Sequence, residues 1–285
     1  DFAADVSSAS WLMTIYLIAN AALITIGGRL GDMYGHQRIF NIGLVCVGFA
    51  SLICAISPNL GILIFGRFLQ GAAGAAVLPN GYAMIRYHAP ANQRGRAFGI
   101  VTACNAASAS AAPAIGGIFV ELFNWQSVFL LNVAFVIISL ILASRFIGKL
   151  ATSKGEKRSF DHLGSIFLAL FSGFLSLAIS VRSGGGIAPW WRVGLFAFSG
   201  ACFVLLLVQE RRTTFPLIQF SLFRIRNFSA STLCGIFLNL TMYGLLLITP
   251  LILQQVLGYE PTRAGVVMLM LTGSVAITAP VSGAL

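Results

Sequence analysis

The feature that most constrains this chain is a series of apolar runs, each about 20 residues long, separated by short polar or charged links. A run of that length, wound as an α-helix, crosses the roughly 30 Å hydrocarbon core of a membrane. Inside hydrocarbon the backbone must satisfy its own hydrogen bonds, so each run is expected to be helical. Charged residues make up 9% of the 285 residues, whereas a soluble domain carries about 25%. The sequence therefore predicts an all-α, polytopic membrane protein.

About nine such runs follow one another along the chain. They span 10–30, 39–57, 60–84, 95–120, 126–147, 163–181, 191–208, 228–256 and 263–285. All five cysteines fall within these runs, so we expect buried free thiols and neither a disulfide framework nor a metal site. The chain lacks an initiator Met and ends in an apolar run, and we expect it to be a fragment of a longer protein.

The basic residues are distributed unevenly among the links. Fourteen of the 18 Lys and Arg lie in the links after the first, third, fifth and seventh runs or within three residues of them. By the positive-inside rule these links are cytoplasmic and the N-terminus lies outside, as in a multi-pass protein of the inner or plasma membrane. Topology and contact with anionic lipid then account for the net charge of +10, and nucleic-acid binding is not expected.

The first cytoplasmic link, residues 28–38, is short enough to require a tight reversal of the chain. Gly31 and Gly35 permit the positive φ angles of such a turn, and Asp32 is placed to cap the following helix. The link resembles the cytoplasmic signature of the major facilitator superfamily, in which Gly, Leu, Asp and Gly recur at fixed spacing before basic residues. The matching positions are Gly28, Leu30, Asp32, Gly35 and Arg38.

The link departs from that signature at Met33, His36 and Gln37, where the family usually has Arg or Lys. These departures weaken the charge network and leave the turn intact. The resemblance implies that Asp32 and Arg38 are gate residues, which hold helix ends together in one conformation and release them in another.

Arg67 is the one basic residue well inside an apolar run, about seven residues or roughly 10 Å past its outer end. A cation there costs at least a few kcal/mol unless it faces a cavity or a partner, or snorkels to the outer surface. Gln70 lies one turn further on the same face. Arg67, Gln70 and Gly71 resemble the fourth-helix motif of the superfamily, which implies a residue that lines the transport pathway.

The fourth run is rich in small residues, which let helix backbones approach closely. It resembles the fifth-helix motif of the proton antiporters in this superfamily, with two of the motif's glycines replaced by Ser and Ala. The positions concerned are Gly99, Ser108, Ala112, Pro113, Gly116 and Gly117. The resemblance implies antiport, and the alternative is a tightly packed helix with an ordinary proline kink.

Three regions are expected. Residues 1–147 form an N-terminal helical bundle without its first helix, and residues 227–285 begin a C-terminal bundle, where Gly-x-Leu recurs at 283–285 as at 28–30. Residues 148–226 hold a cytoplasmic linker, two extra helices and an interfacial segment, which resembles the fourteen-helix drug:proton antiporters.

The resemblance covers nearly the whole chain and implies a proton-coupled secondary transporter that exports hydrophobic or amphipathic compounds by alternating access. The proton gradient takes the place of a cofactor, and the expected partners are the bilayer, protons and a small hydrophobic or cationic substrate, with a monomeric protein. No acidic residue lies deep in a run, so the proton-carrying residue is expected in the absent first helix. The candidate lining residues are Arg67, Gln70, Asn105, Asn239, Tyr243 and Gln254.

Other functions stay open at this point. A facilitator or symporter for a small nutrient would share the fold, and a membrane receptor or scaffold would need no gate. Each lining candidate can equally be a polar group that is satisfied by helix packing. An enzyme is not expected, because His36, His88 and His162 lie in separate links, away from any catalytic constellation.

Overall fold

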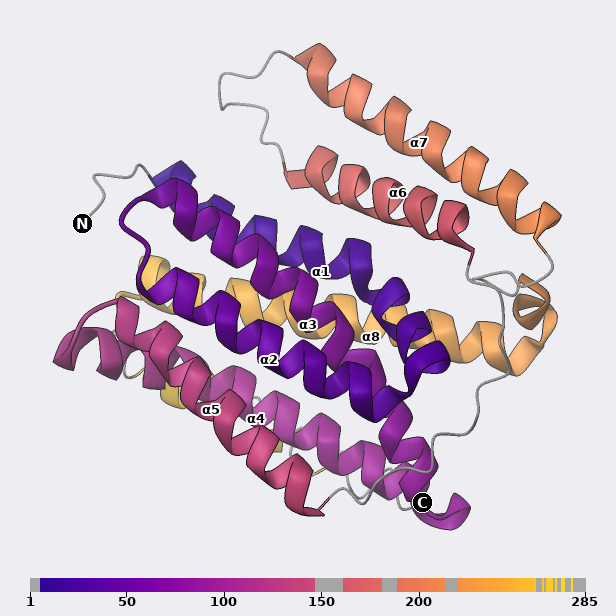
Figure 1. Ribbon diagram of the computed structural model, residues 1–285. Helices are drawn as coiled ribbons and strands as arrows, with labels where there is room; N and C mark the ends of the chain where they lie inside the picture. Colours follow the sequence, from indigo (N-terminus) through magenta and orange to yellow (C-terminus); the bar gives the residue numbers. More distant parts are fainter. Residues whose placement is uncertain are drawn as a thin grey trace. The chain divides into compact units, whose positions relative to one another are not determined.

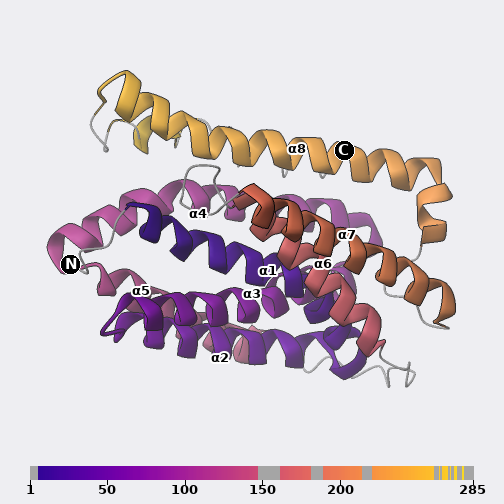
Figure 2. The same ribbon diagram turned by 90° about the horizontal axis from the view of Figure 1, so that it is seen from above.

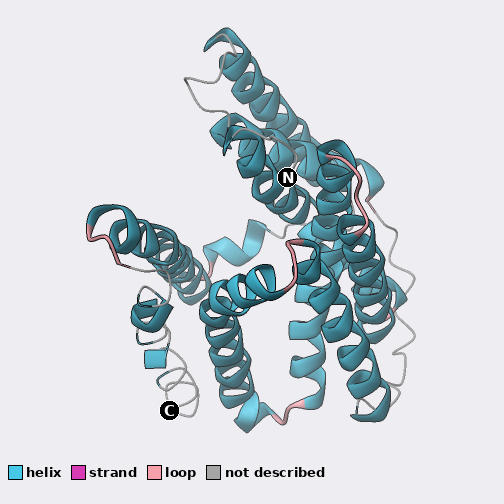
Figure 3. Ribbon diagram, turned by 90° about the vertical axis from the view of Figure 1, so that its left-hand side faces the viewer, coloured by secondary structure: helices cyan, strands magenta, loops and turns pink. Residues whose placement is uncertain are grey.

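The computed structural model describes residues 6–146, 161–180, 189–213 and 220–259, and scattered residues between 263 and 278. Within these ranges the chain is helical and forms no β-strand (Figure 3). It divides into two compact units, of which the first comprises residues 1–84 with 125–218 and the second residues 85–124 with 219–285. The all-α prediction is therefore confirmed for the part of the chain that is described.

Eight α-helices follow one another in the described ranges (Figure 1). They are α1 (Val6–Tyr34), α2 (His36–Ala55), α3 (Leu60–His88), α4 (Arg94–Leu122), α5 (Gln126–Phe146), α6 (His162–Ser180), α7 (Pro189–Arg212) and α8 (Arg226–Leu251). Each coincides with one expected apolar run, and the ninth run lies largely outside the described residues. Six of these eight described helices are long and apolar enough to cross a membrane, namely α1, α2, α3, α5, α6 and α7.

In the first unit α1, α2 and α3 lie side by side, α5 packs on α2, and the α6–α7 hairpin packs through α6 on α1 (Figures 1 and 2). Glycines bring α1 and α3 together. A Cβ on Gly27 would overlap the carbonyl of Ala75, and one on Gly71 would overlap the carbonyl of Tyr16. Small residues matter here because helices in lipid associate through close packing rather than by escaping water.

Contacts at the two ends of α3 fix the direction of its neighbours. Near the start of α3, Arg67 contacts Leu12 on α1 and the ring of Phe129 on α5. Near its other end, Asn80 contacts Gly27 on α1. α1 and α3 therefore run in the same direction. α5 does so too, because Phe129 contacts the start of α3, whereas Val136, seven residues later, lies against Gly48 in the middle of α2. The last turns of α1 and α5 thus lie at one end of the unit. This places Asp32 and Arg145 at the same end, as the charge pattern predicts.

The reversal between the first two helices is shorter than expected. α1 continues through Asp32 to Tyr34, and α2 begins at His36, so Gly35 alone turns the chain, with φ of 96°. The expectation that Gly31 supplies a positive φ was wrong, because that residue is helical. Asp32 does not cap α2, whose N-terminus has no side-chain cap bond. Both errors arise because α1 extends beyond its apolar run by a further polar turn.

The prediction of buried thiols was right for two of the five cysteines. Cys54 and Cys202 are buried, whereas the other three, Cys46, Cys104 and Cys234, are exposed, and all five are free. An apolar run shows that a residue belongs to a spanning helix. It does not show whether that residue faces protein or lipid, because both surroundings are apolar.

The α6–α7 hairpin is joined by aromatic pairs and by one buried carboxylate. Phe171 lies 4.9 Å from Phe203, and Phe174 lies 4.7 Å from Phe198, measured between ring centres. At the end where α6 begins, Asp161 accepts hydrogen bonds from the backbone N–H of Gly164 and from two side chains at the end of α7. The linker of residues 149–160 lies outside the described residues.

In the second unit α4 is a continuous helix that includes position 113. A Cβ on Gly116 or Gly117 would meet no other atom within 4 Å in the described part of the chain. Before α8, residues 220–224 form a 3-10 turn in which Leu222 and Phe223 are exposed. The three predicted regions are not settled by these two units and stay a prediction.

Candidate functional site

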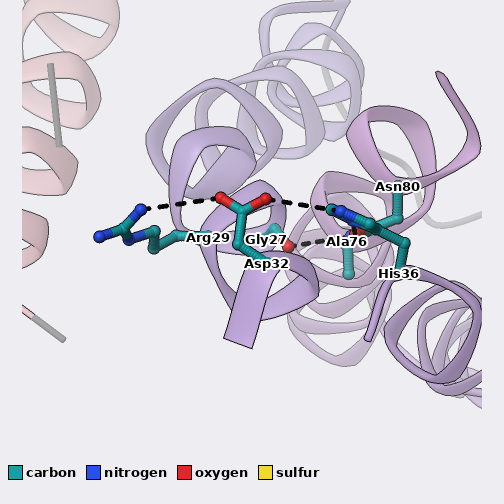
Figure 4. Close-up of polar contacts among 6 residues, drawn as sticks. All are labelled: Gly27, Arg29, Asp32, His36, Ala76 and Asn80. Carbon is teal, nitrogen blue, oxygen red and sulfur yellow. Dashed lines mark hydrogen bonds and ion pairs between the residues drawn. The ribbon is translucent and has the colours of Figure 1, made fainter. Parts of the chain in front are cut away.

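The last turn of α1 carries a small polar network around Asp32 (Figure 4). Oδ2 of Asp32 lies 3.8 Å from Nη1 of Arg29, and Oδ1 lies 3.5 Å from Nε2 of His36, the first residue of α2. The Asp32 side chain is 55% exposed, whereas those of Arg29 and His36 are 16% and 12% exposed. The exposed carboxylate of Asp32, in the last turn of α1, thus lies between a guanidinium and an imidazole that are both mostly buried.

Asn80 on α3 lies beneath this network and is completely buried. Its Nδ2 donates to the carbonyl oxygens of Gly27 at 2.9 Å and Ala76 at 2.7 Å, and its Oδ1 lies 2.7 Å from Nδ1 of His36 (Figure 4). Sequence reasoning missed this residue. The available signal was an amide inside an apolar run, since polar groups there usually hold helices together or serve function.

An open depression of about 370 Å³ adjoins the network at the α1 surface. Its lining residues are Ile24, Thr25, Gly28, Arg29, Asp32 and Pro79. Gly28 and Asp32, both positions of the signature motif, therefore face the same hollow. Arg38 lies outside it as an exposed residue, and among the described residues it forms no ion pair.

A second polar cluster surrounds Arg67, toward the other end of the first unit. Its Nε donates to the carbonyl of Leu12 at 3.1 Å, and its Nη1 donates to Oε1 of Gln70 at 2.7 Å. The guanidinium carbon lies 5.0 Å from the ring centre of Tyr16 and 5.8 Å from that of Phe129. Arg67 therefore points into the helix bundle and does not snorkel to the surface.

Gln70 extends this cluster to α2. It is 4% exposed, and its Nε2 donates to Oγ of Ser51 at 2.8 Å. Within the described residues, Arg67 contacts neutral groups: a backbone carbonyl, an amide and two aromatic faces. In a low-dielectric setting such a cation is sensitive to any negative charge that comes near it. Tyr16, Ser51 and Phe129 were not singled out from sequence, because each is an ordinary residue of a spanning helix.

The candidate lining residues differ in their surroundings. Arg67 and Gln70 are in contact, whereas Asn105 on α4 and Asn239 on α8 are exposed, and Nδ2 of Asn239 donates to the carbonyl of Gly235 within its own helix. The side chains of Tyr243 and Gln254 lie outside the described residues. Lining therefore stays a prediction for all of these positions.

The antiporter-motif positions on α4 have mixed surroundings. Gly99 is buried, Gly116 is partly exposed, and Ser108, Ala112 and Gly117 are exposed; the side chain of Pro113 is outside the described part. Small side chains on an exposed helix face leave room for another helix. Their role in antiport stays a prediction.

The apolar helices, the shared orientation of α1, α3 and α5, and the polar networks at either end define a multi-pass integral membrane protein. Comparison with known proteins identifies its family. A family model described as Major Facilitator Superfamily matches residues 1–285, and the chain belongs to that family.

Characterised relatives include resistance and export proteins. The chain is 33% identical to the methylenomycin A resistance protein of Bacillus subtilis, over 93% of this chain and 56% of the relative. It is 30% identical to the tetracenomycin C resistance and export protein of Streptomyces glaucescens, over 99% of this chain and 52% of the relative. A riboflavin transporter of Clostridioides difficile is 28% identical over the whole chain and 61% of its own length. The chain thus spans about half the length of these relatives.

Proposed function

We propose that this chain is part of a proton-coupled secondary transporter that exports hydrophobic or amphipathic compounds across the cell membrane. The observation that carries the proposal is family membership over the whole chain, together with relatives described as resistance and export proteins. Transport by this family type proceeds by alternating access, in which helix bundles rock about a central site. No chemical step is needed, and the proton gradient supplies the energy.

The network at the end of α1 supports a gating role for Asp32. A carboxylate that is half exposed and loosely paired, at 3.5 and 3.8 Å, exchanges partners at little cost. Two arrangements of similar free energy are what a gate requires, because substrate or proton binding then shifts their populations. Gly28 and Asp32 would contact the moving partner through the depression that they line.

The cluster around Arg67 supports a role in the transport pathway. The cation is held between α1, α3 and α5, and the groups that contact it in the described part of the chain are neutral hydrogen-bond acceptors and ring faces. A carboxylate that loses a proton nearby would be strongly attracted to it. Arg67 would in this way link proton release to the arrangement of the bundle.

A second candidate function is transport of a metabolite. It is favoured by the similarity to a riboflavin transporter, which covers the whole chain. The same fold and gate would serve it, and the substrate would be a flat polar heterocycle rather than a hydrophobic cation. Arg67 and Gln70 would then offer hydrogen-bond donors to that ring system.

The test uses the full-length protein in proteoliposomes, with an imposed proton gradient and a fluorescent cationic dye or riboflavin as cargo. Efflux of the dye that stops when a protonophore collapses the gradient is the expected result. Riboflavin movement without dye movement would replace export of hydrophobic compounds by the second candidate. If neither compound moves while the protein is correctly inserted, the proposed function is wrong.

A further inference from the structure

The imidazole of His36 has a hydrogen-bond acceptor at each of its two nitrogens. Nδ1 lies 2.7 Å from Oδ1 of Asn80, and Nε2 lies 3.5 Å from Oδ1 of Asp32 (Figure 4). The ring lies between α1 and α3 and is 12% exposed. Imidazole is the side chain that ordinarily gains and loses a proton between pH 5 and 8. The contact between His36 and Asp32 is therefore one that a proton can change.

The amide of Asn80 has only one orientation that satisfies its neighbours. Nδ2 donates to the carbonyl oxygens of Gly27 and Ala76, at 2.9 and 2.7 Å. A flipped amide would direct an oxygen at two other oxygens and lose both bonds. The hydrogen-bond network thus assigns Oδ1 to the side that faces His36, where it accepts and does not donate.

This orientation determines where His36 carries its hydrogen. Because Oδ1 of Asn80 is an acceptor, Nδ1 of His36 must donate. A neutral imidazole has one N–H, so the neutral ring presents the lone pair of Nε2 to the carboxylate of Asp32, and that contact is repulsive. When a second proton binds at Nε2, the imidazolium pairs with Asp32 through charge and an N–H.

We propose that Asn80 is a positioning residue of the gate: by fixing the hydrogen of His36 on Nδ1, it makes the attraction between His36 and Asp32 depend on proton concentration at this end of the protein. The inference rests on the proposed function in treating Asp32 as a gate residue. Proton binding at His36 draws the carboxylate toward α2, and proton loss leaves it to Arg29, 3.8 Å away on α1.

The surroundings of the ring are consistent with this switch. From α1, Asp32 faces the imidazole and Arg29 lies on the other side of that carboxylate. From α3, Asn80 faces it and does not titrate, and on α2 itself Arg38 is an exposed cation two residues further on. A Cβ at Gly31 would lie 2.5 Å from Nδ1 of His36, so the backbone of α1 closes the space beside the ring.

The first test needs no transport. Full-length protein with ¹⁵N-labelled histidine is placed in lipid nanodiscs at about pH 9, where imidazole is neutral. Nuclear magnetic resonance then reports which ring nitrogen carries hydrogen, and the His36 signal is assigned by its loss in His36→Gln. We expect Nδ1–H in the wild type and Nε2–H in Asn80→Leu, which removes the acceptor at similar volume. A wild-type signal from Nε2–H overturns the inference.

Asn80→Asp is the second variant, because it keeps an acceptor toward Nδ1 if Asn80→Leu fails to fold. An ionised carboxylate oxygen accepts and cannot donate, so the ring of His36 should carry hydrogen on Nδ1 in this variant as in the wild type. A His36 ring with hydrogen on Nε2 alone in Asn80→Asp overturns the assigned contact between these two residues.

The transport test compares pH profiles at a constant gradient. His36→Arg carries a permanent charge, so the rate of this variant should lose the pH dependence that proton binding at His36 gives the wild type. If Asn80 had only a structural role, Asn80→Leu would lower the transport rate by the same factor at every pH. If Asn80 positions His36, Asn80→Leu should change the shape of the pH profile. Superimposable profiles for wild type and His36→Arg overturn the inference while leaving transport intact. Absence of any gradient-driven transport contradicts the proposed function instead. The inference about Asn80 and His36 is then still decided by the nuclear magnetic resonance measurement.

Discussion

The guanidinium carbon of Arg67 lies 5.0 Å from the centre of the Tyr16 ring, so a cation on α3 rests against an aromatic face of α1. The same guanidinium donates to the backbone of Leu12, one turn before Tyr16. Together with Phe129 on α5, these contacts join three helices that are separated by up to 117 positions, from Leu12 to Phe129. This cluster gives the first prediction.

Arg67→Ala should destabilise the protein, because it removes two charge-assisted hydrogen bonds and two cation–π contacts at once. We expect a loss on the order of 2 kcal/mol, which is a fall in melting temperature of roughly 5 °C. Thermal unfolding of the full-length protein in detergent measures it. Phe65→Ala is the control, since that side chain is on the same helix and 56% exposed. An equal fall in melting temperature for the two variants would contradict the claim that Arg67 stabilises the packing of α1, α3 and α5.

Asp32→Asn should lower transport with little loss of membrane insertion. The amide keeps the size of the side chain but loses the charge that pairs with Arg29 and His36. Initial transport rates are compared with the amount of protein in purified membranes. Glu121→Gln, at the exposed end of α4, is a matched control for loss of a carboxylate. Normal transport by Asp32→Asn would remove the gate assignment.

Gly71→Ala and Gly81→Ala should differ, although both lie on α3. A Cβ at Gly71 would overlap the Tyr16 carbonyl and force α1 and α3 apart, at a cost of about 1–3 kcal/mol. At Gly81 the nearest atom is Cε2 of Phe40 at 3.5 Å, an ordinary contact, and alanine favours the helix by up to about 1 kcal/mol. Melting temperatures of the two variants decide this. Equal stability would show that the close approach of α1 and α3 is not required.

Asp161→Ala should loosen the α6–α7 hairpin. The carboxylate accepts from the Gly164 N–H at 2.9 Å, from Nε2 of Gln209 at 3.2 Å and from Oγ1 of Thr213 at 3.0 Å. The substitution leaves the buried N–H of Gly164 without this acceptor and removes two part-buried contacts to the end of α7, at a cost of about 1–3 kcal/mol. Hydrogen exchange should become faster at the first turn of α6. Asp161→Asn is the milder control, because it keeps one acceptor oxygen. Unchanged hydrogen exchange in Asp161→Ala would show that Asp161 does not hold α6 and α7 together.

Much of the fold could be predicted because long apolar runs in a sequence mark its membrane helices directly. Runs of about 20 apolar residues marked eight helices at nearly the right positions, and the alternation of basic links placed Asp32 and Arg145 at one end. Helix ends were less predictable. α1 and α3 extend through polar turns that hydropathy assigned to links, since interfacial residues can continue a helix.

The candidate site was predictable only in part. Asp32 and Arg67 stand out because a charge near or within an apolar run is unusual. Asn80 did not, although it holds three helices together, because nothing local marks an amide whose partners lie 44 and 53 positions away. Likewise the shortness of the link led us to expect a turn residue at Gly31, whereas its actual role is to leave room for the Asn80 amide.

The sequence by itself determined that this chain crosses a membrane several times, which links share a side, and that it belongs among the major facilitator proteins. The first two properties depend on how long each apolar run is and where the charges fall between runs, and the third on the motif residues of the first link. Only the tertiary structure decided that Arg67 points inward, that Gly35 alone makes the first reversal, and that the His36 ring lies between Asn80 and Asp32. Those features depend on which helix faces meet, and in lipid an apolar pattern does not distinguish a face that packs on protein from one that faces the bilayer.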